Sequence, residues 1–257
     1  VVDFLIEKKN IVLTGAPGTG KTFMAKEIAA TLIGNCSWGD LPYEKQAQVD
    51  FVQFHPSYDY TDFVEGLRPE EDATFKRQDG VFKQFCKRAL SNDEPHVFII
   101  DEINRGELSK IFGELFYSIE PDYRGPAGRV KTQYNNMVHA GDVFKEGFFI
   151  PANVYIIGTM NDIDRGVEAM DFAIRRRFAW KEVTAAESAI NMEIPEKVRA
   201  VMEALNNALI ENGLTEAHCI GGAYFRKLEG SDYKKLWNNH LKGIVTEYFR
   251  GEPEADS

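Results

Sequence analysis

No part of this 257-residue sequence is apolar over the length of a membrane-spanning helix. The longest purely apolar runs are residues 97–100 and 154–157, whereas a helix needs about 20 apolar residues to cross a bilayer. The opening segment, residues 1–9, has Asp3 within its apolar part and its positive charge after that part, which differs from a signal peptide. We therefore expect no membrane association and a cytoplasmic location.

Cysteine is also scarce. Cys36, Cys86 and Cys219 are odd in number, widely spaced and free of any Cys-x-x-Cys pair, which argues against a disulfide framework and against a zinc site. We expect all three side chains to be buried or half-buried, as unpaired cysteines usually are.

Net positive charge is absent. Thirty Lys and Arg residues against forty Asp and Glu residues give a net charge of −10, which argues against a protein that wraps duplex nucleic acid without regard to sequence. A local basic groove remains open, with an ordinary solvated surface as the alternative. The candidate cations are Lys76, Arg77, Lys83, Lys87, Arg88 and those between Lys131 and Lys145.

What is present is a regular alternation of strand-like and helical segments. The strand-like segments are residues 10–14, 49–54, 96–101, 153–158 and 178–183. Such alternation predicts a three-layer α/β domain around a mostly parallel sheet. The apolar runs at 97–100 and 154–157 lack polar alternation, so we expect central strands that are covered on both faces. Function is then expected at the carboxyl ends of these strands.

The chain changes character after about residue 183, where strand signals end and two helical patterns follow. We expect a large α/β domain over residues 1–185, a small helical lid domain over residues 186–250 and a frayed acidic tail over residues 251–257. Between the third and fourth strands, residues 130–134 and 147–150 have the pattern of a β-hairpin with a long polar tip. This hairpin is either a plain surface excursion or an element with a partner-binding or pore-facing role.

The strongest motif is a glycine-rich loop that follows the first strand and precedes a helical run. With the next position included, its residues are Gly15, Ala16, Pro17, Gly18, Thr19, Gly20, Lys21, Thr22 and Phe23. This is the phosphate-binding pattern of Gly, four residues and Gly-Lys-Thr, in the required strand–loop–helix context. Backbone N–H groups surround the phosphates, Lys21 reaches the β and γ oxygens, and the Thr22 hydroxyl binds Mg²⁺.

Two adjacent carboxylates, Asp101 and Glu102, end the third strand. In a chain with a phosphate loop, this pair predicts Asp101 as the Mg²⁺ ligand and Glu102 as the base that deprotonates attacking water. Signalling G proteins lack this glutamate and carry an Asn-Lys-x-Asp guanine reader. No Asn-Lys-x-Asp occurs in this sequence.

Asn161 follows the fourth strand, which we expect to lie beside the Asp101 strand. This arrangement predicts an amide near the γ-phosphate and the attacking water. Arg175, Arg176 and Arg177 end a predicted helix just before the fifth strand. They are either a solvated helix cap or arginine fingers for a neighbouring subunit's nucleotide, and their position alone does not decide between these roles.

Together these motifs resemble the AAA+ P-loop NTPases, and a narrower set resembles the McrB family, the motors of modification-dependent restriction systems. The narrower motifs are residues 52–63, 66–69, 79–82, 101–105, 108–114 and 160–165, within a similarity that runs from about residue 5 to residue 183. The resemblance implies a Mg²⁺-dependent, GTP-fuelled hexamer that translocates DNA with a McrC-like nuclease subunit as its partner.

The resemblance also implies roles for single residues. Asn161 and Asp164 match the family's Asn-x-x-Asp signature, which implies catalytic roles for both, and Lys21 is implied in catalysis as well as binding. Arg165 and Asp171 match positions through which the partner is thought to adjust the signature asparagine. Arg176 and Arg177 fit the arginines that bridge subunits in this family.

Two departures from the family qualify these expectations. The family's lid segment contains a His-Ser pair where this chain has Gly222 and Ala223, so a nucleotide contact through that pair is absent. The sequence also begins at the motor, before which McrB-like proteins usually carry a modified-base reader, so we expect either a trimmed fragment or a family member whose targeting lies elsewhere. Two alternatives stay open: an ATP-fuelled AAA+ protein remodeller of the MoxR or dynein-related kind, and an assembly scaffold that hydrolyses nucleotide slowly.

Overall fold

A computed structural model describes residues 1–71, 73–163, 172–228 and 232–250. The chain divides into two compact units. The sheet unit comprises Val1–Leu13, Thr22–Met160 and the described residues up to Lys181, and the lid unit comprises Thr14–Lys21, Asn161–Ile163 and the described residues from Glu182 onward. The phosphate loop therefore groups with the C-terminal helices. Within the described ranges, no helix is both long and apolar enough to span a membrane.

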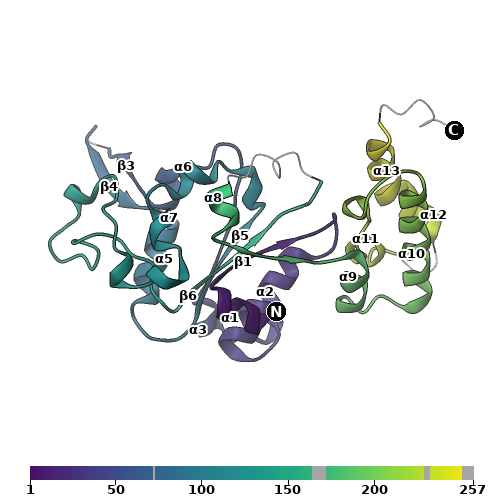
Figure 1. Cartoon of the computed structure of the whole chain (residues 1–257), viewed down its shortest axis with the longest axis horizontal. Helices are drawn as coiled ribbons and strands as arrows, with labels where there is room; N and C mark the ends of the chain where they lie inside the picture. The colour runs from purple at the N-terminus through teal and green to yellow at the C-terminus, as the bar shows by residue number, and fades with distance from the viewer. Residues whose placement is uncertain (72, 164–171, 229–231, 251–257) are drawn as a thin grey trace. The chain divides into compact units, whose positions relative to one another are not determined.

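A five-stranded sheet in the order β2-β5-β6-β1-β7 forms the centre of the sheet unit (Figure 1). Its strands are β1 (Asn10–Thr14), β2 (Val49–Gln53), β5 (His96–Asp101), β6 (Val154–Thr159) and β7 (Ala179–Glu182). The β1–β6, β5–β6 and β2–β5 pairs are parallel. Residues 96–100 of β5 and every residue of β6 are buried, which requires cover on both faces. The α/β fold and its two predicted central strands are confirmed.

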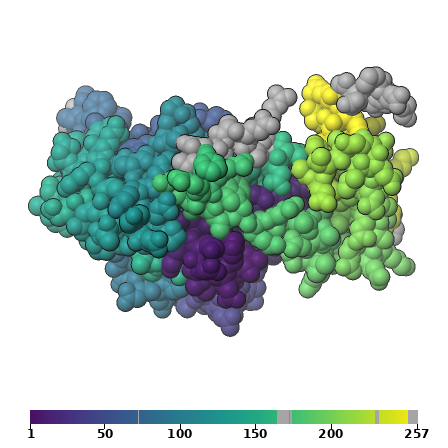
Figure 2. All heavy atoms as spheres, viewed as in Figure 1, coloured from purple at the N-terminus to yellow at the C-terminus, as the bar shows by residue number. Residues whose placement is uncertain are grey.

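Helices surround this sheet. They are α1 (Val2–Lys8), α2 (Lys21–Gly34), α3 (Tyr43–Gln46), α4 (Tyr60–Phe63), α5 (Val81–Ala89), α6 (Leu108–Phe112), α7 (Leu115–Ser118) and α8 (Phe172–Arg175). Short 3₁₀ turns are η1 (Trp38–Asp40), η2 (Ile103–Arg105), η3 (Pro121–Tyr123), η4 (Pro126–Gly128) and η5 (Asn135–Met137). Figure 2 shows the N-terminal residues beside the segment that leads into β7, as expected from neighbouring β1 and β7.

The predicted hairpin between residues 130 and 150 is wrong. Only one antiparallel bridge forms there, between Val130 and Phe148. Phe144 and Phe148 are fully buried and their rings meet at 4.7 Å, so the segment packs against the core instead of extending as paired strands. A hairpin forms instead between β3 (Glu65–Pro69) and β4 (Phe75–Asp79), which was not predicted from the sequence.

The basic residues between Lys76 and Arg88, which were candidates for DNA contact, largely form ion pairs within the chain. Lys83 is fully buried and its Nζ lies 2.6 Å from the equally buried Glu65 carboxylate. Arg77 also pairs with Glu65, at 2.5 Å, and Lys87 pairs with Asp79. These three cations are therefore part of an ion-pair network that connects β3, β4 and α5. For Lys83, full burial contradicts both a contact with DNA and a place on a solvated surface.

The lid unit has its own core. Its elements are α9 (Ala185–Asn191), α10 (Glu196–Glu211), η7 (Glu216–His218), α11 (Gly222–Phe225), α12 (Tyr233–Leu236), the π-turn η8 (Trp237–Leu241) and α13 (Lys242–Tyr248). Met202, Leu209, Ile220 and Phe225 are buried in this core. A capping box between Thr184 and Glu187 starts α9. Both predicted helical patterns form helices, while the domain boundary near residue 185 stays a prediction.

Candidate nucleotide site

The phosphate loop leaves β1 and turns sharply into α2, and glycines make that turn possible. Gly15, Gly18 and Gly20 have φ values of +144°, +74° and +79°, which side chains rarely allow. Space is also limited. A Cβ atom on Gly15 would lie 2.3 Å from the Val183 carbonyl oxygen. The spacing of glycines in the motif is therefore required by both backbone conformation and packing.

Lys21 is folded into this loop and is only 7% exposed. Its Nζ donates to the carbonyl oxygens of Gly15 at 3.0 Å and Ala16 at 2.9 Å, and lies 3.3 Å from the Thr19 hydroxyl. Thr19 in turn donates to Ala16 at 3.0 Å. The loop thus concentrates one ammonium charge with the backbone N–H groups of a helix start, an arrangement that suits phosphate.

Asp162 also contacts the loop, although no role was expected for it from the sequence. Its backbone N–H donates to the Gly15 carbonyl at 3.2 Å. Burial raises the pKa of its carboxyl above the usual range, while the Lys21 ammonium and hydrogen bonds from Gly15 and Thr14 oppose that rise. The only signal in the sequence was its position directly after Asn161. Asp162 is therefore hydrogen-bonded to the phosphate loop within the lid unit.

In the sheet unit, the two predicted magnesium ligands are in contact. The Thr22 hydroxyl donates to Asp101 Oδ1 at 2.7 Å, and the Thr159 hydroxyl donates to the same oxygen at 2.6 Å. Asp101 ends β5 and Thr159 ends β6, so two adjacent parallel strands bring their last residues to one edge of the sheet. Thr22, in the first turn of α2, meets Asp101 there. A cluster of hydroxyl and carboxylate oxygens fits Mg²⁺, which prefers oxygen ligands. Thr159 was not predicted.

Glu102 follows Asp101 in an uncommon backbone conformation. Its φ of +53° and ψ of 46° lie in the left-handed region and turn the chain from β5 into η2. Its carboxylate lies 3.2 Å from Arg105 Nε, and its side chain is 21% exposed. Its backbone N–H lies 3.4 Å from the Thr159 hydroxyl. The residue predicted to act as base therefore has a strained backbone and a basic neighbour.

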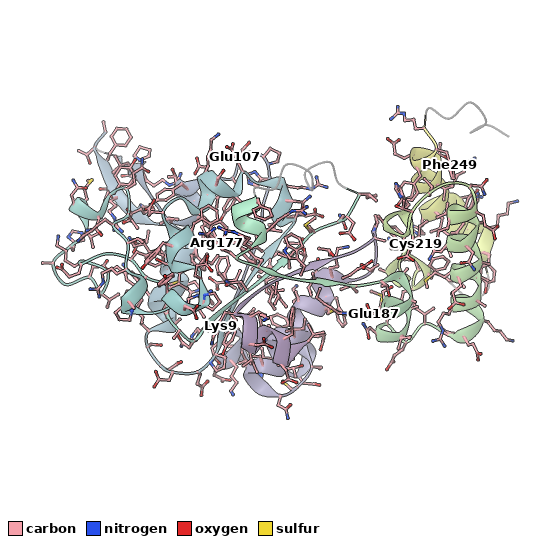
Figure 3. The ribbon with its side chains drawn as sticks, viewed as in Figure 1. Lys9, Glu107, Arg177, Glu187, Cys219 and Phe249 are labelled. Carbon is pink, nitrogen blue, oxygen red and sulfur yellow. The ribbon has the colours of Figure 1, made fainter. Side chains whose placement is uncertain are left out.

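The three arginines before β7 differ in their surroundings. Arg177 Nε donates to the Phe116 carbonyl at 2.7 Å and lies 3.1 Å from Glu120, with its side chain 16% exposed. Figure 3 shows Arg177 among the side chains of the sheet unit. Arg175 and Arg176 are exposed, and the Arg176 guanidinium lies 5.9 Å from the centre of the Phe172 ring. Arg177 is thus held within its own chain, whereas Arg176 faces solvent.

The remaining predicted positions are Asn161, Asp164, Arg165, Asp171 and Phe23. Asn161 is half-buried in the lid unit, directly before Asp162. Asp164, Arg165 and Asp171 lie outside the described residues. Phe23, predicted as part of the nucleotide contact, is 48% exposed on α2.

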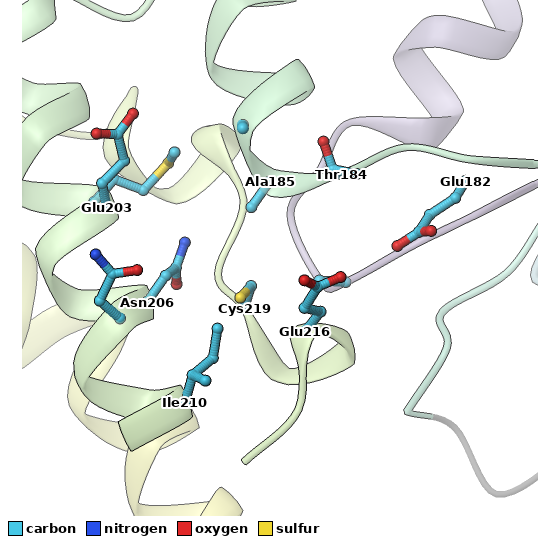
Figure 4. A pocket seen from close by; sticks show the side chains of 12 residues that line it. Glu182, Thr184, Ala185, Glu203, Asn206, Ile210, Glu216 and Cys219 are labelled. Carbon is cyan, nitrogen blue, oxygen red and sulfur yellow. The ribbon is translucent and has the colours of Figure 1, made fainter. Parts of the chain in front are cut away.

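A cavity of about 340 Å³ lies in the lid unit, with Ala16 of the phosphate loop in its wall (Figure 4). Glu182, Glu203 and Glu216 contribute carboxylates to the lining, together with Asn207. An acidic lining of this kind suits groups that donate hydrogen bonds and repels phosphate.

A P-loop with an Asp-Glu strand end defines a P-loop NTPase, and comparison with known proteins places the chain within that class. The family model for the AAA domain, dynein-related subfamily, matches residues 10–178. The chain belongs to this family.

Two curated proteins are similar to it. The type IV methyl-directed restriction enzyme EcoKMcrB subunit of Escherichia coli K12 is 45% identical over 178 residues, which cover 68% of this chain and 35% of that protein. The type II restriction enzyme BsuMI component YdiS of Bacillus subtilis 168 is 24% identical, over 93% of this chain and 70% of that protein. The predicted resemblance to McrB is confirmed, and the chain spans about a third of the E. coli protein.

A crystal structure of a protein proposed to be an ATPase, from Cytophaga hutchinsonii, is also similar at 17% identity with a TM-score of 0.40, over 86% of this chain and 52% of that one.

Proposed function

We propose that this chain is the motor of a McrB-like restriction complex and that it hydrolyses GTP with Mg²⁺. The observation that carries the proposal is the contact between Thr22 and Asp101, next to Glu102 in the chain. Hydroxyl, carboxylate and general base are the groups that an NTPase needs beyond its phosphate loop. The similarity to two restriction proteins supports the restriction context.

Each residue has a distinct task in this proposal. The loop N–H groups and Lys21 bind the phosphates, and Thr22 and Asp101 hold Mg²⁺, which when bound neutralises charge on the phosphates. Glu102 takes a proton from the attacking water, for which its carboxylate must separate from Arg105. Asn161 orients that water with its amide. Asp164 is proposed to assist Asn161, as in the family's signature.

GTP is expected to be preferred over ATP. Guanine presents N1–H and N2–H₂ donors and an O6 acceptor where adenine does not, and each buried group left unpaired with adenine would cost about 1–3 kcal/mol. We expect kcat/KM with Mg²⁺ to be at least about tenfold higher for GTP, measured with and without a McrC-like partner. Equal values or an ATP preference would favour the protein-remodelling alternative, and negligible turnover of both would favour the scaffold.

Turnover is expected to require neighbouring subunits, with Arg176 as the residue that reaches the next nucleotide. Arg176→Ala subunits should be inactive alone yet support turnover when mixed with Lys21→Ala subunits, because each mutant supplies what the other lacks. The readout is phosphate release against mixing ratio, with co-assembly checked by native mass spectrometry. No rescue despite co-assembly would make Arg176 a helix cap.

Arg177→Ala is the matched control for this experiment. Because Arg177 contacts Glu120 and Phe116, its loss should lower the melting temperature, whereas loss of the exposed Arg176 should not. A normal melting temperature with lost turnover for Arg177→Ala would instead favour Arg177 as the bridging residue.

The partners follow from the same proposal. We infer a homo-oligomer, a hexamer as in McrB-like motors, that works with a McrC-like nuclease subunit and contacts DNA through the assembled complex. With Lys83 and Arg77 engaged in ion pairs, the exposed Lys131 is a better candidate for DNA contact in the sheet unit. A cytoplasmic location stays a prediction.

A further inference from the structure

The lid segment Gly221–Tyr224 is hydrogen-bonded to the backbone of the phosphate loop, and both belong to the lid unit. The Gly221 N–H donates to the Pro17 carbonyl at 2.9 Å, and the Ala223 N–H donates to the Gly18 carbonyl at 2.9 Å. Between them, the Gly222 N–H donates to the buried Ser188 hydroxyl at 2.9 Å. The N–H groups at the start of α11 therefore donate hydrogen bonds to the phosphate loop and to α9.

These hydrogen bonds orient the groups that phosphate needs. A trans peptide is planar, and its C=O and N–H bonds point in opposite directions. The Pro17 carbonyl shares a peptide with the Gly18 N–H, and the Gly18 carbonyl shares one with the Thr19 N–H. When the lid holds these two carbonyls, it directs both N–H donors away from itself. Hydrogen bonding at the carbonyl also polarises the peptide and strengthens its N–H as a donor.

Close packing makes this contact sensitive to single atoms. A Cβ on Gly221 would lie 2.4 Å from the Gly18 carbonyl group and from the Thr19 nitrogen, all backbone atoms that cannot move aside cheaply. A Cβ on Gly18 would lie 2.4 Å from the Tyr224 ring. The ring thus covers Gly18 from the lid side.

The composition of the segment fits this arrangement. Gly222 has little space around it, because a Cβ there would lie 3.2 Å from the Ala189 backbone. Gly222 and Ala223 have no polar side-chain group with which to bind a nucleotide. These positions can therefore influence a bound nucleotide through their hydrogen bonds to the main chain of the phosphate loop.

We propose that the lid segment is a positioning element for the phosphate loop: Gly221 and Ala223 orient the loop's N–H donors through its carbonyls, and Tyr224 holds Gly18 in place. This inference rests on the proposed function, since it assumes that the loop binds a nucleoside triphosphate. It assigns the lid a part in binding that involves no side-chain contact with the nucleotide.

The test is an equilibrium titration of the full chain with fluorescent GTP and ATP analogues in Mg²⁺. The variants are Gly221→Ala, Tyr224→Ala and Tyr224→Phe, and Gly243→Ala is a matched control, because a Cβ on Gly243 meets no atom within 4 Å. Gly221→Ala and Tyr224→Ala should each weaken binding by about tenfold, the scale for losing one or two oriented hydrogen bonds. Tyr224→Phe and Gly243→Ala should bind like wild type.

Melting curves of the nucleotide-free proteins separate positioning from folding. The proposal requires weakened binding in a variant whose melting temperature stays close to that of wild type. If Gly221→Ala does not fold, the pair Tyr224→Ala and Tyr224→Phe decides. Wild-type affinity in Gly221→Ala and Tyr224→Ala overturns the inference and leaves the proposed function standing. If the wild-type protein binds neither analogue, the proposed function fails, and the inference fails with it.

Discussion

Lys21→Ala is expected to lose nucleotide binding by a factor of about a hundred or more. Lys21 is the side-chain cation of the phosphate loop, and its ammonium is already desolvated at 7% exposure. Hydrogen bonds to charged groups contribute about 1.5–3 kcal/mol each, so losing one or two with the phosphates produces a loss of this size. Titration with fluorescent GTP and ATP analogues in Mg²⁺ measures the effect directly.

The control for this prediction is Lys8→Ala, which removes an exposed lysine that pairs only with its neighbour Glu7 among the contacts described. It should bind nucleotide like wild type. Lys21→Ala with unchanged affinity would remove the phosphate loop from the site. Because the alanine variant also leaves the Gly15 and Ala16 carbonyls without their ammonium donor, melting curves must show that the variant is folded.

The motifs could be predicted from the sequence because their chemistry and their local structure coincide. The segments 10–14 and 96–101 are apolar runs bounded by turn formers, and they match β1 and β5 residue for residue. Parallel strands bring their carboxyl ends to one edge, so the contact between Thr22 and Asp101 followed from the fold class. Local pattern and global fold agree at these positions.

Features set by tertiary packing could not be predicted. Residues 130–150 alternate like a hairpin, yet the burial of Phe144 and Phe148 decides their conformation. In the sequence, Lys83 looks like an ordinary surface lysine. Its burial could not be predicted, because its partner Glu65 lies on a separate hairpin whose register the sequence does not indicate.

The same reason explains the residues missed at the site. Asp162 and Tyr224 contact a loop that is more than a hundred residues away in the chain. No periodicity or motif connects two such segments. Only the fold shows that Asp162 and one turn of the lid meet the same phosphate loop.

Glu102→Gln is expected to separate binding from chemistry. Glutamine has the same shape as glutamate and tolerates the left-handed backbone at φ +53° equally well, but it cannot accept the water's proton. Turnover should fall by about 10²–10⁴, the usual effect of removing an acid–base group, while affinity for the nucleotide analogues stays close to wild type. Single-turnover phosphate release gives the first value, and the titration gives the second.

Glu107→Gln is the matched control, since Glu107 is an exposed carboxylate nearby whose described partner is Lys110. It should leave turnover unchanged. Glu102 also contacts Arg105, so part of any loss in Glu102→Gln has to be distinguished from the loss of that ion pair. Arg105→Ala removes this ion pair and keeps the glutamate. If Glu102 is the base, Arg105→Ala should retain far more turnover than Glu102→Gln, whereas equal losses would assign the effect to the ion pair and not to proton transfer.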